Sequence, residues 1–505
     1  MKNIFKIVGV SILAISIYSC SDSYFDVNTP SNILANEVVV MKDVLSPCIQ
    51  YTMTAQFQAS TNIAIVDQHI TTIVQDRQGI DNHYLSTLDN YWATVYTKAL
   101  PNIKVLEEKS ITTNSSHYLA IAKVLKAINI GQTTDIYGDV PYTEATLSGQ
   151  NFTPKYDSQQ TIYADVIKLL DDAIVLFSSP NTSTFAPGSE DLIYAGNITK
   201  WAKAAYTFKA RYQLHLSKIN GSVATGNAVV ESLAKGFTAN TEDFQIKYNA
   251  VNVNPWYASQ LGLFAGNVLY AISNQFISYM NGGTVYPFTT VNMDPRLPLL
   301  VDMRTYNGAG ISGSQPTTGA GFIGTTNGTG TGSSAKIGTE FYYSNATAPT
   351  VILSYAEAKF MEAEAQFLIN GGNATTTGTN AASYAAYKAG ITANMTKLGV
   401  ASASQTAYLS DTSIDKGAAA LELKDIMRQK FIALFLNPET FTDYRRYDFS
   451  ANAFKGLTIP VNTDPVNGGK WIRRFVYSTN ERGSNATNYS ANFKPMVTPV
   501  WWDKQ

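Results

Sequence analysis

The sequence predicts a mainly α-helical fold, in which stacked tetratricopeptide-like helical hairpins carry long loop-rich insertions. Three observations lead to this fold class. Apolar residues recur at helical spacing in many segments, no long segment alternates polar and apolar residues, and the helical segments are short and joined by short loops. The strict tetratricopeptide consensus is absent, so the periodicity supports stacked helical pairs without fixing the repeat family.

Two segments show the clearest helical periodicity. Residues 161–177 place seven apolar side chains on one stripe, namely Ile162, Val166, Leu169, Leu170, Ala173, Ile174 and Phe177. Residues 199–218 do the same with Trp201, Ala205, Phe208, Tyr212 and Leu216. Such a stripe buries one face of a helix against its neighbours, so both segments are predicted to be amphipathic helices.

End signals support two further helices. The segment 351–372 finishes in Gly371-Gly372, a common C-terminal signal. Within 421–441, Asn437-Pro438 is typical of an N-cap followed by proline at the first position of a new helix. Additional helices are expected near 38–75, 86–109, 115–135, 257–281 and 381–398.

A loop-rich insertion is predicted near 240–350, within one helical domain spanning 37–505. Residues 307–338 hold ten glycines and no charge before Lys336. Such a composition favours a long surface loop over a packed element, and loops of this length are usually functional or disordered. We keep both flanks in one domain, because neither half has the pattern of a self-sufficient unit.

The N-terminus predicts export and a lipid anchor. Residues 1–19 combine an early basic start with an apolar run too short to span a bilayer, which is the pattern of a signal peptide. Ser19 directly precedes Cys20, as in the lipobox of bacterial lipoproteins, so Cys20 is the predicted lipidation site and 20–36 a lipidated tether. Tyr18 departs from the usual small residue, and an ordinary signal peptide with an incidental cysteine is the alternative.

The charge and amino-acid composition limit the classes of partner that the protein is expected to bind. The formal charge is −1, and removing 1–19 with its two lysines gives −1 − 2 = −3. A nearly neutral chain without basic runs lacks the clustered Lys and Arg that nucleic acids require, so no nucleic-acid partner is expected. The second cysteine, Cys48, lies in an apolar setting that favours a buried, inert thiol.

Enzyme motifs are missing, so no catalytic residue, metal ligand or cofactor is predicted. The four histidines are scattered and form no zinc-spaced cluster: His69, His83, His117 and His215. GAGFIG at 319–324 matches a dinucleotide fingerprint, but it lies in the glycine-rich loop without a preceding strand or a following helix. The match is therefore best explained by chance.

Several charged and aromatic groups are predicted to be structural. Glu439 with Arg445 and Arg446 could form a catalytic acid and an anion clamp, but a buried ion-pair network is the preferred interpretation. Glu357 and Glu364 share a helical face and are expected to be solvated or ion-paired. A second set is expected in the core: Trp92, Tyr96, Trp201, Trp501 and Trp502.

Seven segments in order resemble the SusD/RagB family of nutrient-binding outer-membrane lipoproteins, especially its second SusD-like subgroup. They are YFDVNTPSN after Cys20, TDIYGDVPYTEA at 134–145, NITKWAKAAYTFKARYQL at 197–214, DPRLPLL at 294–300, ILSYAEAKFMEAEA at 352–365, QKFIALFLNPETFTDYRRYDF at 429–449 and RRFVYSTNE at 473–481. Tyr206 and Phe441 depart from the family's usual small or amide residue and Trp, respectively. Both are interpreted as packing positions.

The resemblance implies a function. Members of the family capture an oligosaccharide or another nutrient at the outer membrane, facing the extracellular side, and close over a SusC-like TonB-dependent transporter. An oligosaccharide is the expected ligand; a non-carbohydrate nutrient such as a peptide is the alternative. Two other classes stay open, a surface glycoside hydrolase and a pure protein-interaction module.

The resemblance also implies ligand-binding loops at 76–84, 254–257 and 285–288. Three side chains there are expected to orient the ligand: Arg77, Gln78 and Tyr84. Four aromatic side chains are expected to form a stacking surface: Trp256, Tyr257, Tyr286 and Phe288. For each aromatic residue, packing of the loop against the core is an equally weighted alternative.

Overall fold

The computed structural model describes residues 40–73, 78–146, 151–332 and 335–504. The predicted signal peptide, the lipidated tether with Cys20, and Arg77 lie outside these ranges. Helices dominate the rest, and the strands are short, so the predicted mainly α fold is confirmed. No helix in the described part of the chain is long and apolar enough to cross a membrane.

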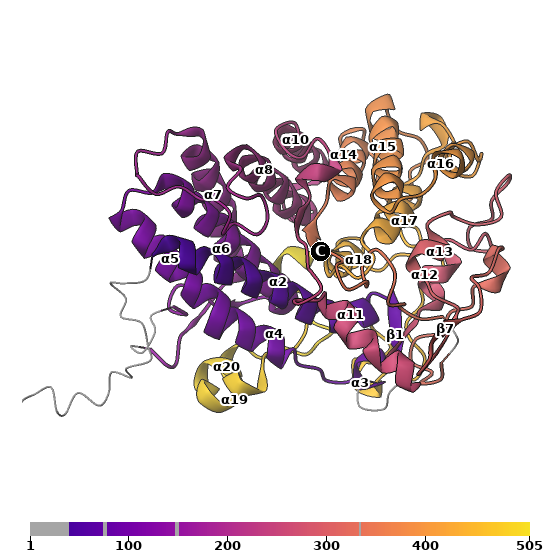
Figure 1. Ribbon diagram of the computed structural model, residues 1–505, viewed down its shortest axis with the longest axis horizontal. Coiled ribbons are helices and arrows are strands. Elements are labelled where there is room, and N and C mark those ends of the chain that lie inside the picture. The colour runs from indigo at the N-terminus through magenta and orange to yellow at the C-terminus, as the bar shows by residue number, and fades with distance from the viewer. Residues whose placement is uncertain (1–39, 74–77, 147–150, 333–334, 505) are drawn as a thin grey trace, which may run out of the picture.

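Most of the scaffold is a row of helices in which each packs on the next (Figure 1). The row runs from left to right along the upper part of the view, with α2 and α5 beneath its left end. Its members are α2 (Met41–Val66), α5 (Leu100–Thr112), α6 (Ser116–Tyr137), α7 (Gln159–Ser178), α8 (Ile198–His215), α10 (Ser222–Leu233), α14 (Tyr355–Ile369) and α15 (Ala381–Lys397). This is the stacking that the helical periodicity predicts.

The helix ends follow the local sequence. Side-chain oxygens of Ser158, Asn197 and Asn380 accept backbone N–H groups in the first turns of α7, α8 and α15. Gly138, at φ +86°, ends α6 in a conformation that glycine adopts without strain. Gly131 lets Tyr212 of α8 approach the surface of α6, where a Cβ atom would collide with the ring.

Helices α17 (Leu423–Ala433) and α18 (Glu439–Arg446) lie near the middle of the view, and both are almost fully buried (Figure 1). The side-chain oxygen of Asn437 accepts the backbone N–H of Glu439, as expected for an N-cap, although the helix begins one residue later than predicted.

The predicted packing of five aromatic residues in the core is confirmed. Trp92, Trp201 and Trp502 are buried, and Tyr96 and Trp501 pack against the core. Cys48 is buried and free, and burial raises its pKa well above the ordinary value.

Short antiparallel strand pairs tie distant segments together. Strand β1 (Ile70–Thr72) pairs with β5 (Tyr270–Ile272), and β4 (Phe244–Ile246) pairs with β8 (Thr350–Leu353). Two further pairs are local, β2 (Val140–Pro141) with β3 (Tyr156–Asp157), and β6 (Thr305–Asn307) with β7 (Gly310–Ser312). The β1–β5 pair connects the end of the N-terminal helix α2 to the middle of the chain, and the β4–β8 pair joins the two ends of the loop-rich region.

Two predicted helices are shorter than expected. Residues 257–281 are not one helix but α11 (Pro255–Gln260), a 3₁₀ turn (Leu261–Ala265), β5 and α12 (Asn274–Ser278). Gly266 at φ +78° breaks the helix, and Tyr270 to Ile272 pair instead with β1. The helix expected over 38–75 ends at Val66 for the same reason, since the following residues supply β1.

The described parts of the glycine-rich segment, residues 307–332 and 335–338, pack against the core more closely than predicted. Phe322, Ala335 and Ile337 are buried in the core cluster. Gly319 and Gly324 lie so close to the backbone of 273–281 that a side chain on either would collide with it. The prediction that this segment stays out of the core is wrong, because its glycines permit close backbone packing that no periodic pattern signals.

Candidate ligand-binding site

A polar cavity of about 220 Å³ opens beside α12, in the loop-rich part of the molecule. We call it the α12 cavity and define it by its lining residues: Gln68, Ser273, Asn274, Gln275, Ser278, Val285, Thr326, Asn327, Gly456, Thr458, Ile459 and Pro460. None of them is charged. Side-chain amides and hydroxyls dominate, and these groups both donate and accept hydrogen bonds.

The N-terminal end of α12 joins the cavity to the glycine-rich segment. The hydroxyl of Ser273 caps α12 by accepting the backbone N–H of Gln275 and donates to the Asn327 side-chain oxygen at 2.6 Å. The amide of Asn274 donates to the hydroxyl of Thr326 at 3.0 Å. Asn274 and Thr326 are both exposed, so this polar pair is accessible to solvent.

The early loop 78–84 is fastened to the same wall by Asp81. Its buried carboxylate accepts hydrogen bonds from the Thr71 hydroxyl (2.6 Å), the Asn327 amide (2.7 Å) and the Gly328 backbone N–H (2.6 Å). Burial raises the pKa of the Asp81 carboxyl, although these hydrogen bonds oppose the shift. Asp81 therefore links the segment 71–81 with residues 327–328, about 250 positions later in the sequence.

Hydrogen bonds of Asn82 and Gln68 also join segments that surround the α12 cavity. The Asn82 amide donates to the carbonyl oxygens of Val461 (2.9 Å) and Gly328 (3.1 Å). The Gln68 amide donates to the Thr458 carbonyl at 2.8 Å, from a residue with φ +60°. Sequence reasoning missed Asp81, Asn82 and Asn327, because nothing local in one sequence pairs residue 81 with residue 327.

Of the predicted loops, 285–288 contributes Val285 to the lining of this cavity, whereas residues 78–84 are not part of the lining and are joined to it through the contact of Asp81 with Asn327. Tyr84 is 47% exposed and lies next to the fastened Asn82. Val285 lines the cavity, and Tyr286, 7% exposed, packs beside it under the guanidinium of Arg428, which lies 4.2 Å from the ring centre. Phe288 is partly buried against Tyr408, with ring centres 5.5 Å apart.

The loop at 254–257 lies elsewhere. Trp256 is 6% exposed and packs edge-on against Phe57 and Tyr270, with ring centres 5.3 and 5.6 Å away. It lines a separate small cavity with Phe57, whereas Tyr257 is partly buried on α11. Gln78 begins α3 (Gln78–Asp81).

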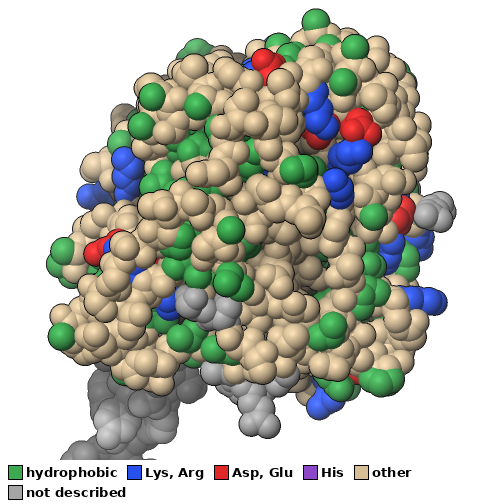
Figure 2. Space-filling model, turned by 90° about the vertical axis from the view of Figure 1, so that its right-hand side faces the viewer, with side chains coloured by type: hydrophobic (Ala, Val, Ile, Leu, Met, Phe, Trp, Pro, Cys, Tyr) green, Lys and Arg blue, Asp and Glu red, His purple; other side chains and the backbone are tan. Residues whose placement is uncertain are grey.

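Hydrophobic side chains on the side of the molecule that carries α12, α13 (Leu297–Leu300) and α16 (Ser402–Leu409) form small separate groups (Figure 2). Charged side chains on this face are few, and polar surface separates the hydrophobic groups. Scattered hydrophobic groups of this kind are normal on a protein surface, so this face shows no large apolar patch.

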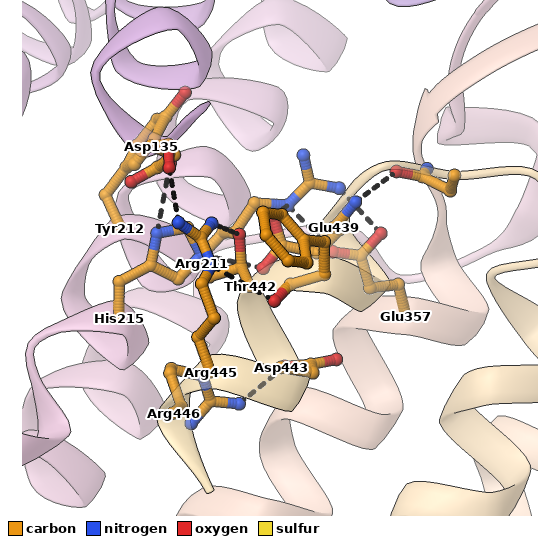
Figure 3. A network of polar contacts seen from close by, with 12 residues as sticks. Asp135, Arg211, Tyr212, His215, Glu357, Glu439, Thr442, Asp443, Arg445 and Arg446 are labelled. Carbon is orange, nitrogen blue, oxygen red and sulfur yellow. Dashed lines mark hydrogen bonds and ion pairs between the residues drawn. The ribbon is translucent and has the colours of Figure 1, made fainter. Parts of the chain in front are cut away.

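The charged motif around Glu439 forms a buried network of ion pairs and hydrogen bonds (Figure 3). Arg211 holds the Glu357 carboxylate with two contacts of 2.7 Å, and the His215 imidazole contacts Glu439 at 2.7 Å. Burial opposes protonation of His215, but the neighbouring carboxylates of Glu439 and Asp135 raise its pKa to about 9. The ion-pair interpretation is confirmed.

Glu364 belongs to a second part of this network. Its carboxylate contacts Arg446 at 2.6 Å and Lys430 at 3.7 Å, and Arg446 also contacts Asp443 at 2.6 Å. Glu357 and Glu364 are both fully buried, so the alternative of a solvated face is wrong. The network joins α8, α14, α17 and α18 at the centre of the scaffold, and removal of one partner would leave a buried charge without compensation.

Within the described ranges, no group of three or more His, Cys, Asp or Glu side chains could hold a metal ion. The polar centres thus divide into a buried ion-pair network and an open, uncharged cavity. The cavity, unlike the network, has exposed polar groups that a ligand could reach, among them Asn274 and Thr326.

Comparison with known proteins gives the family. Residues 32–478 match the SusD-like family described as starch-binding and associating with the outer membrane. The chain therefore belongs to this SusD-like family. No curated protein sequence matches it.

Solved structures share the fold. A SusD/RagB family protein from Bacteroides thetaiotaomicron has a TM-score of 0.71 at 22% identity, over 92% of this chain and 99% of that one. A chitin-binding protein gives 0.71 at 24% identity, over 92% and 100%. A chitin-binding SusD homologue from Flavobacterium johnsoniae gives 0.67 at 19% identity, over 92% and 98%.

Proposed function

We propose that this protein is a cell-surface lipoprotein that binds an oligosaccharide at the α12 cavity and delivers it to a SusC-like TonB-dependent transporter. The observation that carries the proposal is the match of residues 32–478 to a family of starch-binding proteins that associate with the outer membrane. Chitin-binding relatives with the same fold support a glycan ligand. The role is binding and not catalysis.

The chemistry of the α12 cavity supports a sugar ligand. Its amides and hydroxyls can donate to and accept from the hydroxyl groups of a sugar, and the uncharged lining imposes no demand for an ionic ligand. Tyr84 offers an accessible ring for stacking at the edge of the loop that Asp81 fastens. Arg77 and Gln78 belong to the same loop and are proposed to orient the ligand, and Tyr286 and Phe288 are proposed to supply further stacking surface.

Trp256 and Tyr257 would extend the binding surface for a longer ligand. The buried ring of Trp256 would first have to leave its contacts with Phe57 and Tyr270. Alanine at Trp256 therefore combines loss of a stacking surface with loss of core packing, and Tyr257→Ala is the cleaner test of this part of the proposal.

The first experiment is calorimetry on protein starting at Ser21, titrated with malto-, cello-, chito- and xylohexaose, hexagalacturonate and tetra-alanine. Saturable binding of a hexasaccharide supports the proposal. Binding of tetra-alanine alone would replace the ligand class with peptides. Failure of every probe to bind would contradict a nutrient-binding role for this site.

The transporter partnership and the anchor have separate tests. A C-terminally tagged protein, purified from detergent-extracted membranes, should co-purify with a SusC-like transporter identified by mass spectrometry. Cys20→Ser should move the protein out of the membrane fraction, because a diacylated cysteine is the proposed attachment. Recovery without any transporter would reject delivery, and unchanged membrane association of the variant would reject the anchor.

A further inference from the structure

A second, larger polar cavity lies in the helical part of the scaffold. It has a volume of about 620 Å³, within the range of roughly 300–1,000 Å³ that is typical of small-ligand sites. We call it the α15 cavity and define it by its lining residues: Leu192, Ile193, Tyr194, Asn240, Thr241, Asp243, Gln245, Lys247, Tyr342, Thr396 and Lys397.

The two cavities are separate. The α15 cavity is formed by the loop before α8, the segment 240–247 after α10, Tyr342 and the C-terminal end of α15. It shares no lining residue with the α12 cavity. In Figure 1, α8, α10 and α15 lie along the upper part of the molecule, whereas α12 lies at the right.

The floor of the α15 cavity is rigid. The carboxylate of Asp243 contacts the Lys397 ammonium at 2.9 Å, with both side chains at most 3% exposed, and it accepts the backbone N–H of Tyr355 at 2.7 Å. The Asn240 amide donates to the Ala393 carbonyl at 2.9 Å. A site whose walls are already fixed loses little conformational entropy when a ligand binds.

One side of the cavity offers apolar surface. Leu192 is 44% exposed, and Ile193 is partly exposed beside it. The ring of Tyr342 is partly exposed, and the Lys397 ammonium lies 5.6 Å from its centre. Partly exposed aliphatic and aromatic groups next to polar ones suit a ligand with apolar C–H faces and polar edges.

The polar side combines uncharged groups with one rim cation. Thr241 and Thr396 are exposed hydroxyls, and Gln245 is a partly exposed amide whose oxygen has no donor among the residues the structure describes. Rotation of that amide would let it accept a ligand hydroxyl. Lys397 and Asp243 offset each other, so the exposed Lys247 leaves a charge of +1 that disfavours cationic ligands.

We propose that the α15 cavity is a second carbohydrate site that takes a disaccharide or trisaccharide segment, neutral or acidic. Sugar hydroxyls match the mixed donors and acceptors of the wall, and the C–H faces of the ring match Tyr342 and Leu192. A second site on the same chain raises the apparent affinity for a long glycan, because the second contact is intramolecular. The ligand class rests on the proposed function, but the location does not.

The test uses hydrogen–deuterium exchange mass spectrometry with chitohexaose, maltohexaose and hexagalacturonate as probes. Thr396→Trp fills the α15 cavity from an exposed helical position, and Thr392→Trp is its matched control one turn earlier on α15, outside the lining. Thr326→Trp blocks the α12 cavity. Circular dichroism verifies that each variant is folded, and Gln245→Ala provides a second, milder change in the α15 cavity.

At least one probe should slow exchange at 240–247 in wild type and in Thr392→Trp, whereas Thr396→Trp should weaken binding there by at least about tenfold. This protection should persist in Thr326→Trp. No protection at 240–247 with any probe, or protection that both Thr396→Trp and Gln245→Ala leave unchanged, would overturn the second site. If blocking the α12 cavity with Thr326→Trp abolishes all binding, the second site in the α15 cavity is rejected and the α12 site stands. If all binding is abolished by Thr396→Trp and not by Thr326→Trp, the proposal for the α12 cavity is rejected instead.

Discussion

His83 should make the protein less stable in mild acid. Its imidazole is 1% exposed, neither ring nitrogen has a hydrogen-bond partner in the described part of the chain, and burial lowers its pKa to about 4. The unfolded chain has the ordinary value of about 6.5, so between pH 6.5 and 4 the unfolded state binds more protons. The buried neutral ring therefore costs no stability above about pH 6.5, and the free energy of unfolding decreases as the pH falls from 6.5 toward 4.

The expected size follows from these two pKa values. At pH 5 about 97% of unfolded chains carry the proton, against about 10% of folded chains, which amounts to about 2 kcal/mol of lost stability relative to pH 7. Urea unfolding at pH 7 and pH 5 measures this loss for wild type and His83→Asn. Asparagine is the best replacement, because residue 83 has φ +56°, a conformation that asparagine tolerates.

The difference between the two proteins isolates His83 from all other titrating groups. His83→Asn should lose about 2 kcal/mol less than wild type between pH 7 and pH 5. Equal losses in wild type and His83→Asn would refute the argument that a buried, unpartnered imidazole controls this acid sensitivity.

Two further variants test the buried network and the cavity wall. Glu364→Ala leaves the buried Lys430 without one of its two carboxylate contacts, and it should lower the free energy of unfolding in urea by about 3–5 kcal/mol. Glu362→Ala, which removes a partly exposed ion pair on the same helix, should lower it by at most about 1 kcal/mol. Gly328→Ala forces a Cβ atom against the Val461 carbonyl at φ +83° and should cost about 1–3 kcal/mol. Gly313→Ala has the same φ in open space and should cost less.

Each control separates a specific contact from a general effect. If Glu362→Ala destabilises as much as Glu364→Ala, the loss comes from the helix and not from the buried ion pair. If Gly313→Ala costs as much as Gly328→Ala, backbone conformation alone explains the effect and the close approach to the 461 segment contributes nothing.

Local patterns were sufficient for most of the helical scaffold. The stripe in 161–177 became α7 and the Gly371-Gly372 signal marks the end of α14, because helix formation depends on residues three or four positions apart. The prediction of one helix over 257–281 was wrong because residues 270–272 form a strand that pairs with β1, about 200 residues earlier in the sequence. The prediction that the glycine-rich segment forms a surface loop outside the core was wrong, because close backbone packing depends on which residues lie opposite, and composition does not reveal them.

The candidate site was only partly predictable. The resemblance indicated the loops 76–84, 254–257 and 285–288; of these, 285–288 contributes Val285 to the α12 cavity, whereas Trp256 of the loop 254–257 lines a separate small cavity. Asp81 and Asn327 were missed, although together they hold the cavity wall. Their pairing is a long-range property of the folded chain, and each looks like an ordinary loop residue by itself.

The most direct test of the central claim is calorimetric titration of Thr326→Trp with the hexasaccharide that wild type binds. Thr326 is exposed in the wall of the α12 cavity, so tryptophan there should fill the cavity without disturbing the core. Thr112→Trp, at an exposed position at the end of α5, is the matched control. The account predicts at least about a tenfold loss of affinity for Thr326→Trp and none for the control. Unchanged affinity in a folded Thr326→Trp protein would contradict it.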